Sequence, residues 1–442
     1  MSGLAKILLA MGYRVTGSDL ASTPITQRVE LLGGNCYIGH QEENIGDAEL
    51  VVISSAINPD NPELFRAGGK GVPVIHRAEL LAWLMRRQKG IAVAGAHGKT
   101  TTTSMLAMTL EKNGLDPTII VGGELNDIGG NAKLGSGEYL VAESDESDGS
   151  FLKLEPLGAI VTNIDDDHLN YYGSIDNMKA AFKAFLNKIP EEGKAVVCLD
   201  DANIRGIANC GRIPLITYGF NNQADYTLKR VRLNTLQSFA DVYFQGVYLG
   251  SLELSVPGKH NLSNALAVVA ATRWLGLDFE QISGALKEFR GVGRRFQLVG
   301  EVRGVKVIDD YAHHPTEIAA TLQAARQVHQ QRVIVVFQPH RYTRTALLKE
   351  RFGSALSEAD VTIVSEIYSA GEAPIAGVTA QLIVDAVKRN KDSQVVYCPT
   401  TKEVVDYLTA IVRPGDLVLT LGAGDIWTAG VELINRLQEV TP

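Results

Sequence analysis

The sequence predicts an α/β protein of three domains, and three observations carry this prediction. The chain has 442 residues, too many for one hydrophobic core. Short apolar runs of strand length alternate with longer segments of helical periodicity, which is typical of parallel sheets covered by helices. Polar or glycine-rich breaks, RRQKG (86–90) and GVGRR (291–295), separate three such stretches. We therefore expect domains at 1–88, 89–293 and 294–442.

The composition is that of a soluble globular protein, with 45% hydrophobic and 21% charged residues. A net charge of −8 argues against nucleic acid as a partner, because phosphate backbones attract basic surfaces. No apolar run reaches transmembrane length, and the first residues lack the layout of a signal peptide. We therefore expect a cytoplasmic protein that enters no membrane. The four cysteines are Cys36, Cys198, Cys210 and Cys398, and they form no C-x-x-C pair. The sequence therefore indicates no zinc or disulfide framework.

The first domain is expected to be Rossmann-like but to lack its usual beginning. MSGLAKILLAMG (1–12) has the pattern of an amphipathic helix, and YRVTGSD (13–19) that of a strand ending in an acid. This is the second part of a dinucleotide-type βαβ unit. The first strand and its glycine loop would precede Met1, so we expect a chain that starts late. A fold that begins with a helix is the alternative. Further strands are expected at 49–57 and 72–76.

A glycine-rich loop follows the first strand expected in the second domain. Residues 92–103 are AVAGAHGKTTTT, with an apolar strand before the loop and a helix expected from Lys99 to about Asn113. A Walker A loop has four residues between its two glycines, whereas residues 95–98, GAHG, have only two. Further strands are expected at 118–123, 139–144, 159–164 and 195–200, β structure within 225–256, and helices at 262–275 and 279–289.

The chemistry expected at this loop is phosphate binding. Backbone N–H groups at the start of a helix point toward an anion, and the helix dipole adds a favourable potential. Lys99 would reach the outer phosphates of a nucleotide, and Thr100 would place a hydroxyl on Mg²⁺. The alternative is a glycine turn with a threonine-rich cap. The strand and helix on either side of G-K-T favour the nucleotide site.

Polar side chains follow the next two buried strands. In VAESDESDGSF, Glu143 ends a strand, where an acid would complete an Mg²⁺ site beside the loop. Asp145, Glu146 and Asp148 crowd the same turn and stay unassigned, since a solvated acidic loop is the alternative. TNIDDDHLNYYG places Asn163, Asp165 and His168 after the following strand. His168 is either a ligand of a second metal or a structural histidine.

Three later stretches carry polar side chains at the ends of elements. In PGKHNLSNALAV, Asn261 and Asn264 open a helix and are candidates to contact a base or ribose, with helix capping as the alternative. IDDYAHHPTE (308–317) and FQPHRYTRT (337–345) follow strands, at the ligand-binding edge of α/β sheets. In the second of these stretches, Arg341 and Arg344 are suited to binding a carboxylate. The alternative is that they form surface ion pairs. Strands are expected at 306–310, 332–338, 361–366, 395–398 and 417–422.

Taken together, these stretches resemble the Mur ligase family. The resemblance covers essentially the whole chain and rests on SSAINPDNPE, AGAHGKTTT, ESDESDGSF, TNIDDDHLNYY, PGKHNLSNA, GVGRRF, DDYAHHPTE and FQPHRYTRT, in this order. In this family the phosphate loop has the short spacing seen here. The resemblance implies a UDP-binding domain, a central ATPase domain and a Rossmann-like carboxy-terminal domain. The activity it implies joins L-alanine to the carboxylate of UDP-N-acetylmuramate through an acyl phosphate, in a monomer or weak dimer.

The resemblance also implies roles for individual residues. ATP binding falls to Gly95, Ala96, His97, Gly98, Lys99, Thr100, Thr101, Asn261, Asn264, Arg295 and Asp310. The Mg²⁺ ligands implied are Thr100, Glu143 and His168. Substrate contacts are implied for Ser54, Ser55, Ala56, Ile57, Asn163, Tyr311, His313, His314, Arg341 and Arg344. The catalytic set implied is Lys99, His168, Arg341 and Arg344.

Two departures from the family pattern stand out. The strand and glycine loop that the family has just before M-S-G-L-A are absent, so we expect poor affinity for the UDP-sugar or a less stable first domain. Several sister ligases use a carbamylated lysine to bridge two metal ions. Here Phe182 takes that position, with Lys183 one step on, so no carbamate is assigned.

Other functions remain as alternatives. A sister ligase recycles a tripeptide onto UDP-N-acetylmuramate and shares the histidine pair His313–His314. The complete FQPHRYTRT stretch favours the alanine-adding activity instead. Folylpolyglutamate synthetase is similar only in its central domain. An NAD-dependent oxidoreductase would need an intact G-x-G-x-x-G, and LGAGD (421–425) is incomplete. A catalytically impaired nucleotide-binding homologue is disfavoured by Lys99, Thr100 and Glu143.

Overall fold

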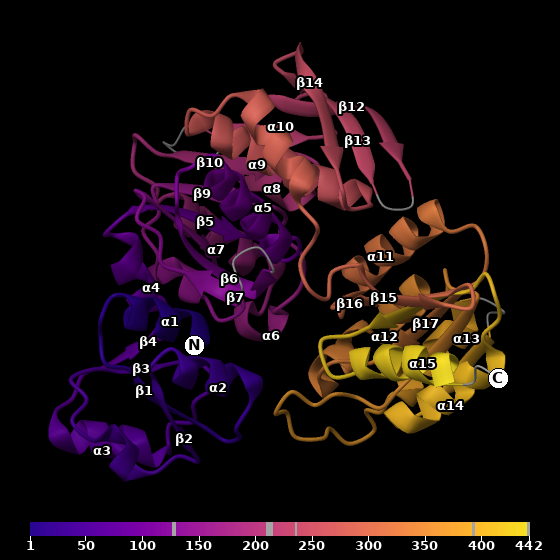
Figure 1. The fold of residues 1–442 in the computed structure, drawn as a ribbon, viewed down its shortest axis with the longest axis horizontal. Helices are drawn as coiled ribbons and strands as arrows, with labels where there is room; N and C mark the ends of the chain where they lie inside the picture. Colours follow the sequence, from indigo (N-terminus) through magenta and orange to yellow (C-terminus); the bar gives the residue numbers. More distant parts are fainter. Residues whose placement is uncertain (126–129, 209–214, 235–236, 391–393, 440–442) are drawn as a thin grey trace. The chain divides into compact units, whose positions relative to one another are not determined.

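The computed structural model describes residues 1–125, 130–208, 215–234, 237–390 and 394–439 (Figure 1). The chain packs into two compact units. The first comprises Met1–Arg230, Asp241–Leu252 and Ser263–Phe289, and the second comprises Val231–Ala240, Glu253–Leu262 and Arg290–Pro442. The expected boundary between residues 88 and 89 falls inside the first unit and stays a prediction.

Two features of the sequence are only partly described. Free thiols are carried by Cys36, Cys198 and Cys398, while Cys210 and two residues of the expected β region, 235–236, lie outside the described residues. None of the helices in the described ranges has the length and the apolar composition that spanning a lipid bilayer requires.

The N-terminal segment contains two small parallel sheets. In the part of it that the structure describes, β1 (Thr16–Asp19) pairs with β2 (Asn35–Ile38), and β3 (Val51–Ile53) pairs with β4 (Val74–His76). The strands at 13–19, 49–57 and 72–76 are confirmed in shorter form, but β2 was not expected. The helices are α1 (Ser2–Ala10), α2 (Pro24–Leu31), α3 (Pro62–Lys70) and α4 (Arg77–Met85), with a 3₁₀ turn η1 (Glu42–Ile45).

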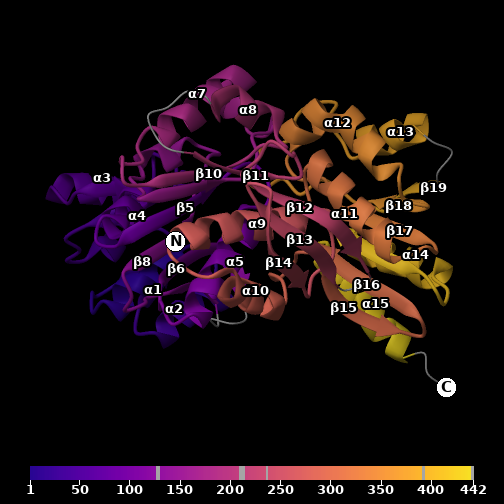
Figure 2. The ribbon, with the colours of Figure 1, turned by 90° about the horizontal axis from the view of Figure 1, so that it is seen from above.

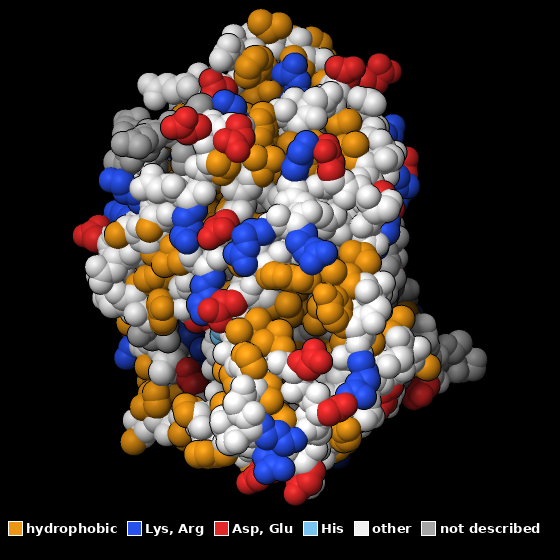
Figure 3. All heavy atoms as spheres, turned by 90° about the vertical axis from the view of Figure 1, so that its left-hand side faces the viewer, with side chains coloured by type: hydrophobic (Ala, Val, Ile, Leu, Met, Phe, Trp, Pro, Cys, Tyr) orange, Lys and Arg blue, Asp and Glu red, His pale blue; other side chains and the backbone are white. Residues whose placement is uncertain are grey.

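Large apolar side chains lie on the surface of this segment. Leu20, Leu31 and Phe65 are each more than half exposed. On the side of the molecule shown in Figure 3, apolar side chains lie among charged ones. Two-stranded sheets offer little area for burial, because three or more strands or a covering helix are needed to enclose a hydrophobic face.

A ten-stranded sheet in the described residues organises the next part of the chain, in the order β14-β13-β12-β11-β10-β9-β5-β8-β6-β7. Its central strands are parallel and almost completely buried, which explains their continuous apolar runs. The bounds are β5 (Lys89–Ala94), β6 (Thr118–Leu125), β7 (Gly130–Lys133), β8 (Tyr139–Glu143), β9 (Gly158–Val161), β10 (Lys194–Cys198), β11 (Leu215–Gly219), β12 (Tyr226–Leu233), β13 (Ser238–Phe244) and β14 (Val247–Leu254).

The helices of this part follow the expected pattern. The helix expected from Lys99 is α5 (Lys99–Lys112) and those expected at 262–275 and 279–289 are α9 (Lys259–Trp274) and α10 (Phe279–Glu288). Shorter elements are η3 (Ser150–Lys153), α6 (Leu169–Tyr172), α7 (Ile175–Leu186) and α8 (Ala202–Ala208). The polar break at 86–90 is shorter than expected, because Lys89 already begins β5.

The topology of the sheet brings three strand ends together. β5 pairs with β8 on one side and with β9 on the other, and all three are parallel. Their carboxyl ends therefore lie side by side, at a point where the chain changes direction across the sheet. Such switch points are where open α/β sheets bind ligands.

The second unit contains a six-stranded sheet within its described ranges, in the order β15-β16-β20-β17-β18-β19. All neighbours are parallel except β15, an antiparallel edge strand that was not expected. The strands are β15 (Gln297–Val302), β16 (Val305–Asp310), β17 (Val333–Phe337), β18 (Val361–Val364), β19 (Gln394–Tyr397) and β20 (Leu417–Leu421). The helices are α11 (Pro315–Val328), α12 (Tyr342–Leu356), α13 (Gln381–Asn390), α14 (Thr401–Ile411) and α15 (Trp427–Glu439).

Helices cover both faces of this sheet. Alternate residues of the strands point to opposite sides, so Val335 and Leu419 face α11, α12 and α13, while Val336 and Val418 face α14 and α15. Figure 2 shows the two groups of helices on opposite sides of the strands. The unit is thus a doubly wound α/β layer, as the alternating sequence pattern predicted.

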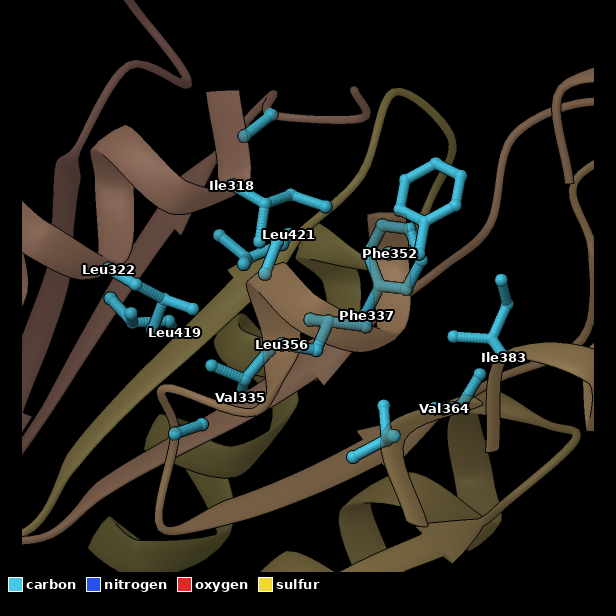
Figure 4. Packing of buried hydrophobic residues seen from close by; sticks show 14 of the residues in the cluster. Ile318, Leu322, Val335, Phe337, Phe352, Leu356, Val364, Ile383, Leu419 and Leu421 are labelled. Carbon is cyan, nitrogen blue, oxygen red and sulfur yellow. The ribbon is translucent and has the colours of Figure 1, made fainter. Parts of the chain in front are cut away.

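The larger of the two cores in this unit is shown in Figure 4. Phe337 of β17 and Phe352 of α12 pack with ring centroids 5.2 Å apart. Leu322, Ile383 and Leu421 complete the layer and are fully buried. Their burial holds strand ends and the following loops in fixed relation, which matters because the polar residues of this unit lie on those loops.

One buried ion pair joins strand starts in the same sheet. Arg332 donates from Nε to Asp416 Oδ1 (2.9 Å) and from Nη2 to Asp416 Oδ2 (2.6 Å), and the aspartate side chain is only 3% exposed. This interaction raises the pKa of Arg332. We predict that Asp416→Ala lowers the free energy of unfolding by about 3 kcal/mol, because it leaves a partly buried cation without its partner.

Chemical denaturation followed by circular dichroism measures this loss. The control is Glu350→Ala, which removes one partner of the exposed Arg389–Glu350 pair (2.8 Å). The control is expected to change stability by less than about 1 kcal/mol. Equal effects of the two substitutions would contradict the prediction.

Candidate active site

The phosphate loop connects β5 to α5 through two glycines with positive φ. Gly95 has φ +133° and Gly98 has φ +82°. A Cβ atom at position 95 would lie 2.2 Å from Thr162 Oγ1, and one at position 98 would lie 2.8 Å from Asn264 Oδ1. Both glycines are therefore required by conformation and by space. The expected strand, short glycine loop and helix are confirmed.

The end of β9 holds this loop in place. Thr162 Oγ1 and Asn163 Nδ2 donate to the backbone oxygen of His97, at 2.6 and 3.0 Å. Asn163 Oδ1 accepts from the backbone N–H of His97 at 2.8 Å, and the imidazole of His97 lies 2.9 Å from Asp165. Asn163, expected to contact a substrate, thus fixes the phosphate loop. Its substrate contact stays a prediction.

Lys99 forms a buried ion pair that was not expected. Its Nζ donates to Glu146 Oε1 at 2.7 Å and to the backbone oxygen of Gly95 at 2.5 Å. The two side chains are 15% and 2% exposed. Burial opposes the charged form of Lys99, but the carboxylates of Glu146, Glu143 and Asp145 outweigh it and raise the Lys99 pKa. Burial, opposed by Lys99, raises the pKa of Glu146 to about 7.

Thr100 and Glu143 meet beside the loop. The hydroxyl of Thr100 donates to Glu143 Oε1 at 3.0 Å, and Glu143 Oε2 accepts from the backbone N–H of Gly122 at 2.8 Å. Glu143 ends β8, the neighbour of β5, so the expected position of this acid is confirmed. A hydroxyl and a carboxylate at this distance form a set of oxygen donors of the kind that Mg²⁺ prefers.

His168 lies near the same group with a left-handed backbone, φ +64°. Its Nε2 atom is 3.9 Å from Glu146 Oε1 and 3.6 Å from Asp167 Oδ2. Within the described part of the chain, Glu146 Oε2 is buried and has no hydrogen-bond partner. An orphaned carboxylate oxygen beside oxygen and imidazole donors fits a divalent cation, so the residues present suit the Mg²⁺ that the sequence implies.

The expected UDP-side residues follow β3 in the first segment. Ser54–Ile57 form a turn, and the Ser55 hydroxyl lies 3.1 Å from His76 Nε2 and also hydrogen-bonds the Asp148 carboxylate. Arg77, at the start of α4, pairs with Asp145 at 2.5 Å. The acidic turn 145–148 is therefore joined to this loop, and the same turn supplies Glu146 to Lys99.

In the second unit, a column of rings lies at the carboxyl ends of the strands. Tyr311 and His313 have ring centroids 5.3 Å apart, and His313 and His340 are 5.4 Å apart. His340 stacks on Tyr368 at 5.9 Å, and Arg344 Nη1 is 3.2 Å from His340 Nδ1. The structure thus brings the expected Tyr311, His313 and Arg344 together. His340 and Tyr368 were not among the predicted site residues.

Arg341 has an unusual backbone at the start of α12. Its φ of +70° and ψ of +141° are costly for a side chain with Cβ. The backbone of Tyr368 holds this conformation, since its oxygen accepts from the Arg341 N–H at 2.8 Å. Among the described residues Arg341 Nε is buried without a hydrogen-bond partner. Strain together with an unsatisfied guanidinium nitrogen is typical of a binding residue.

The other predicted residues of the second unit have structural contacts. His314 is fully buried and caps α11, and Asn261 donates to the backbone oxygen of Pro257 at 2.7 Å. Arg295 lies over the ring of Tyr311. Asp310 accepts from the N–H groups of two loop residues, and burial raises its pKa to about 6. Their ligand contacts stay predictions.

Comparisons with known proteins give the context for this geometry. Residues 1–89 match the catalytic domain of the Mur ligase family, residues 93–272 the Mur ligase middle domain, and residues 294–424 the Mur ligase glutamate ligase domain.

Named relatives match along the whole chain. The UDP-N-acetylmuramate–L-alanine ligase of Pelotomaculum thermopropionicum is 63% identical over 440 residues, which are 99% of this chain and 95% of that protein. The ligase of the same name from Desulforamulus reducens is 53% identical over 442 residues, covering 99% and 96%.

A solved structure agrees with the fold. The UDP-N-acetylmuramate–alanine ligase of Thermotoga maritima is 32% identical and superposes with a TM-score of 0.85, covering all of this chain and 97% of that one. With the short phosphate loop, the Thr100–Glu143 pair and these matches in place, the chain belongs to the Mur ligase family.

Proposed function

We propose that this chain is an ATP-dependent ligase that joins L-alanine to the carboxylate of UDP-N-acetylmuramate in peptidoglycan synthesis, with ADP and phosphate as the other products. The observation that carries the proposal is the phosphate loop after β5, because Lys99 and Thr100 at its end meet Glu146 and Glu143, which the adjacent parallel strand β8 and the turn after it supply. The names of the relatives at 63% and 53% identity supply the substrates.

The chemistry explains why a nucleotide is needed. A carboxylate is a poor electrophile, because its negative charge repels an attacking amine. Transfer of the outer phosphoryl group of ATP to the muramoyl carboxylate gives an acyl phosphate, and the amine of L-alanine then attacks the acyl carbon. The carbon–oxygen bond to phosphate breaks, phosphate leaves, and an amide forms.

The residues of the phosphate loop would stabilise charge on the transferred group. Lys99 exchanges its present contact with Glu146 for the outer phosphate, whose charge it neutralises. Thr100, Glu143 and His168 would hold Mg²⁺, which when bound neutralises negative charge on the phosphate oxygens. The backbone N–H groups at the start of α5 orient the phosphates. Asn261, Asn264, Arg295 and Asp310 are proposed for the rest of the nucleotide.

The incoming amino acid and the UDP-sugar would meet polar side chains on loops. We propose Tyr311, His313 and His314 with Arg341 and Arg344 for the amino acid and its carboxylate, because guanidinium groups pair with carboxylates in a bidentate way. Ser54–Ile57 are proposed for the UDP side. A cytoplasmic location and a monomer or weak dimer complete the proposal.

The first experiment measures ADP release with ATP, Mg²⁺ and UDP-N-acetylmuramate, with and without L-alanine. We expect release that depends on L-alanine. Parallel reactions with the tripeptide L-alanyl-γ-D-glutamyl-diaminopimelate separate the alternative, since a tripeptide-recycling ligase would release ADP with the tripeptide instead. If neither L-alanine nor the tripeptide causes ADP to be released, the proposal is contradicted.

The role of Lys99 has a matched control on the same helix. We predict that Lys99→Ala lowers kcat/KM at least about 100-fold, because an electrostatic contact to the transferred group is lost. Lys112→Ala removes an exposed cation at the other end of α5, where it pairs with Glu288 at 2.6 Å, and is expected to leave turnover unchanged. Steady-state ADP release measures both, and normal turnover in Lys99→Ala would refute the mechanism.

The strained backbone of Arg341 predicts that glycine is tolerated better than alanine at this position. Glycine adopts φ +70° without strain, so Arg341→Gly should be more stable than Arg341→Ala by about 1 kcal/mol. Both variants lack the guanidinium group and should lose ligase activity. Thermal unfolding and ADP release of the two proteins measure this. An Arg341→Gly protein as unstable as Arg341→Ala would show that the conformation carries no strain.

A further inference from the structure

We propose that Glu146 is a ligand of a divalent cation in this site, together with His168, and that it leaves Lys99 to take up this role when the nucleotide binds. The inference rests on the proposed function and names a metal ligand beyond Thr100, Glu143 and His168. It concerns the phosphate-loop region alone, where all these residues belong to one compact unit.

The geometry of Glu146 singles it out among the acids of its turn. Asp145 pairs with Arg77, and Asp148 accepts from Ser55 and from the backbone N–H of Ser150. Glu146 instead turns inward, and its carboxylate is the one in this turn that reaches both Lys99 (2.7 Å) and His168 Nε2 (3.9 Å). It is therefore placed at the reacting end of the loop.

The two carboxylate oxygens of Glu146 are used unequally. Oε1 accepts from Lys99, whereas Oε2 is buried and lacks a hydrogen-bond partner within the residues that the structure describes. Buried acceptors are normally satisfied, so an orphaned one in a binding site calls for an explanation. A divalent cation satisfies a carboxylate oxygen without a hydrogen-bond donor.

Nucleotide binding makes this need stronger. When Lys99 turns to the outer phosphate, Glu146 loses its counter-ion while it remains almost completely buried. A buried charge stripped of its partner is strongly destabilising. A cation beside His168 would replace Lys99 as the positive partner, so binding of the nucleotide and the cation would reinforce each other.

Several sister ligases bridge two metal ions with a carbamylated lysine. At the matching position this chain has Phe182, which offers no carboxylate. Phe182 is fully buried in α7 and packs against Phe151, with ring centroids 5.1 Å apart, and Phe151 in turn packs against Phe185 at 5.0 Å. Lys183, the next residue of the helix, is exposed. Glu146 is a carboxylate already at the site and provides the charge that Phe182 lacks.

The test counts bound ions rather than turnover. Mn²⁺ replaces Mg²⁺, and the signal of free Mn²⁺ in electron paramagnetic resonance is followed while the intact chain is titrated with Mn²⁺ in the presence of a non-hydrolysable ATP analogue. We expect two ions per chain in the unmodified protein. In Glu146→Gln one of them should weaken at least about tenfold, because a metal ligand is lost.

Two further variants make the result specific. Glu138→Gln makes the same chemical change at an exposed acid that directly precedes β8 and pairs with Lys89 of β5, and this variant should bind both ions normally. Glu146→Asp keeps the charge but withdraws it by one methylene, and it should weaken one ion. Glu146→Asp decides the matter if Glu146→Gln fails to fold, which thermal unfolding without ligands detects.

The outcomes separate this inference from the proposed function. If the unmodified chain binds no Mn²⁺ with the analogue, the proposed function and this inference both fail. If it binds two ions and Glu146→Gln binds both with unchanged affinity, the ligand role alone is overturned. Weaker analogue binding in Glu146→Gln with both ions retained also overturns it, because Glu146 would then act only through Lys99.

Discussion

The buried ion pair between Lys99 and Glu146 is the interaction on which the site depends. Removing two charges from water is costly, and the cost is offset only when geometry and further hydrogen bonds are good. The chain meets this condition by placing Lys99 at the start of α5, directly after the loop that follows β5, and the turn that carries Glu146 after β8, the parallel neighbour of β5. The same arrangement brings Thr100 to Glu143 and joins the turn to the N-terminal segment through Arg77. One pair thus orders both sides of the phosphate loop.

Local signals explain what the sequence predicted well. The G-K-T stretch between an apolar run and a helix gave the loop, because glycine conformation, strand burial and helix start are encoded within a dozen residues. The strands β2, β7, β11 and β15 escaped prediction because they are short or edge elements, and their formation depends on a partner strand rather than on their own pattern. Glu146 escaped for a related reason. Three acids share one turn, and only the tertiary position of each decides its partner.

In the second unit, too, some site residues were predicted from the sequence and others were missed. The sequence predicted polar residues at the carboxyl ends of parallel strands. In the structure Tyr311, His313 and Arg344 do lie together there. Tyr368 was missed because it follows β18 in a loop with no distinctive pattern, yet its backbone fixes Arg341 and its ring stacks on His340. Residues that shape a site through their backbone leave little trace in a sequence, since almost any side chain permits the same hydrogen bond.

The close approach of Gly98 to Asn264 has a consequence for how the protein is made. The glycine lies at the start of α5, and the asparagine lies on α9, far later in the chain. A ribosome that has released β5 and α5 has not yet synthesised the residue that packs on the loop. The loop can therefore be completed only after most of the ten-stranded sheet has emerged, so an unfinished chain does not possess an assembled nucleotide site.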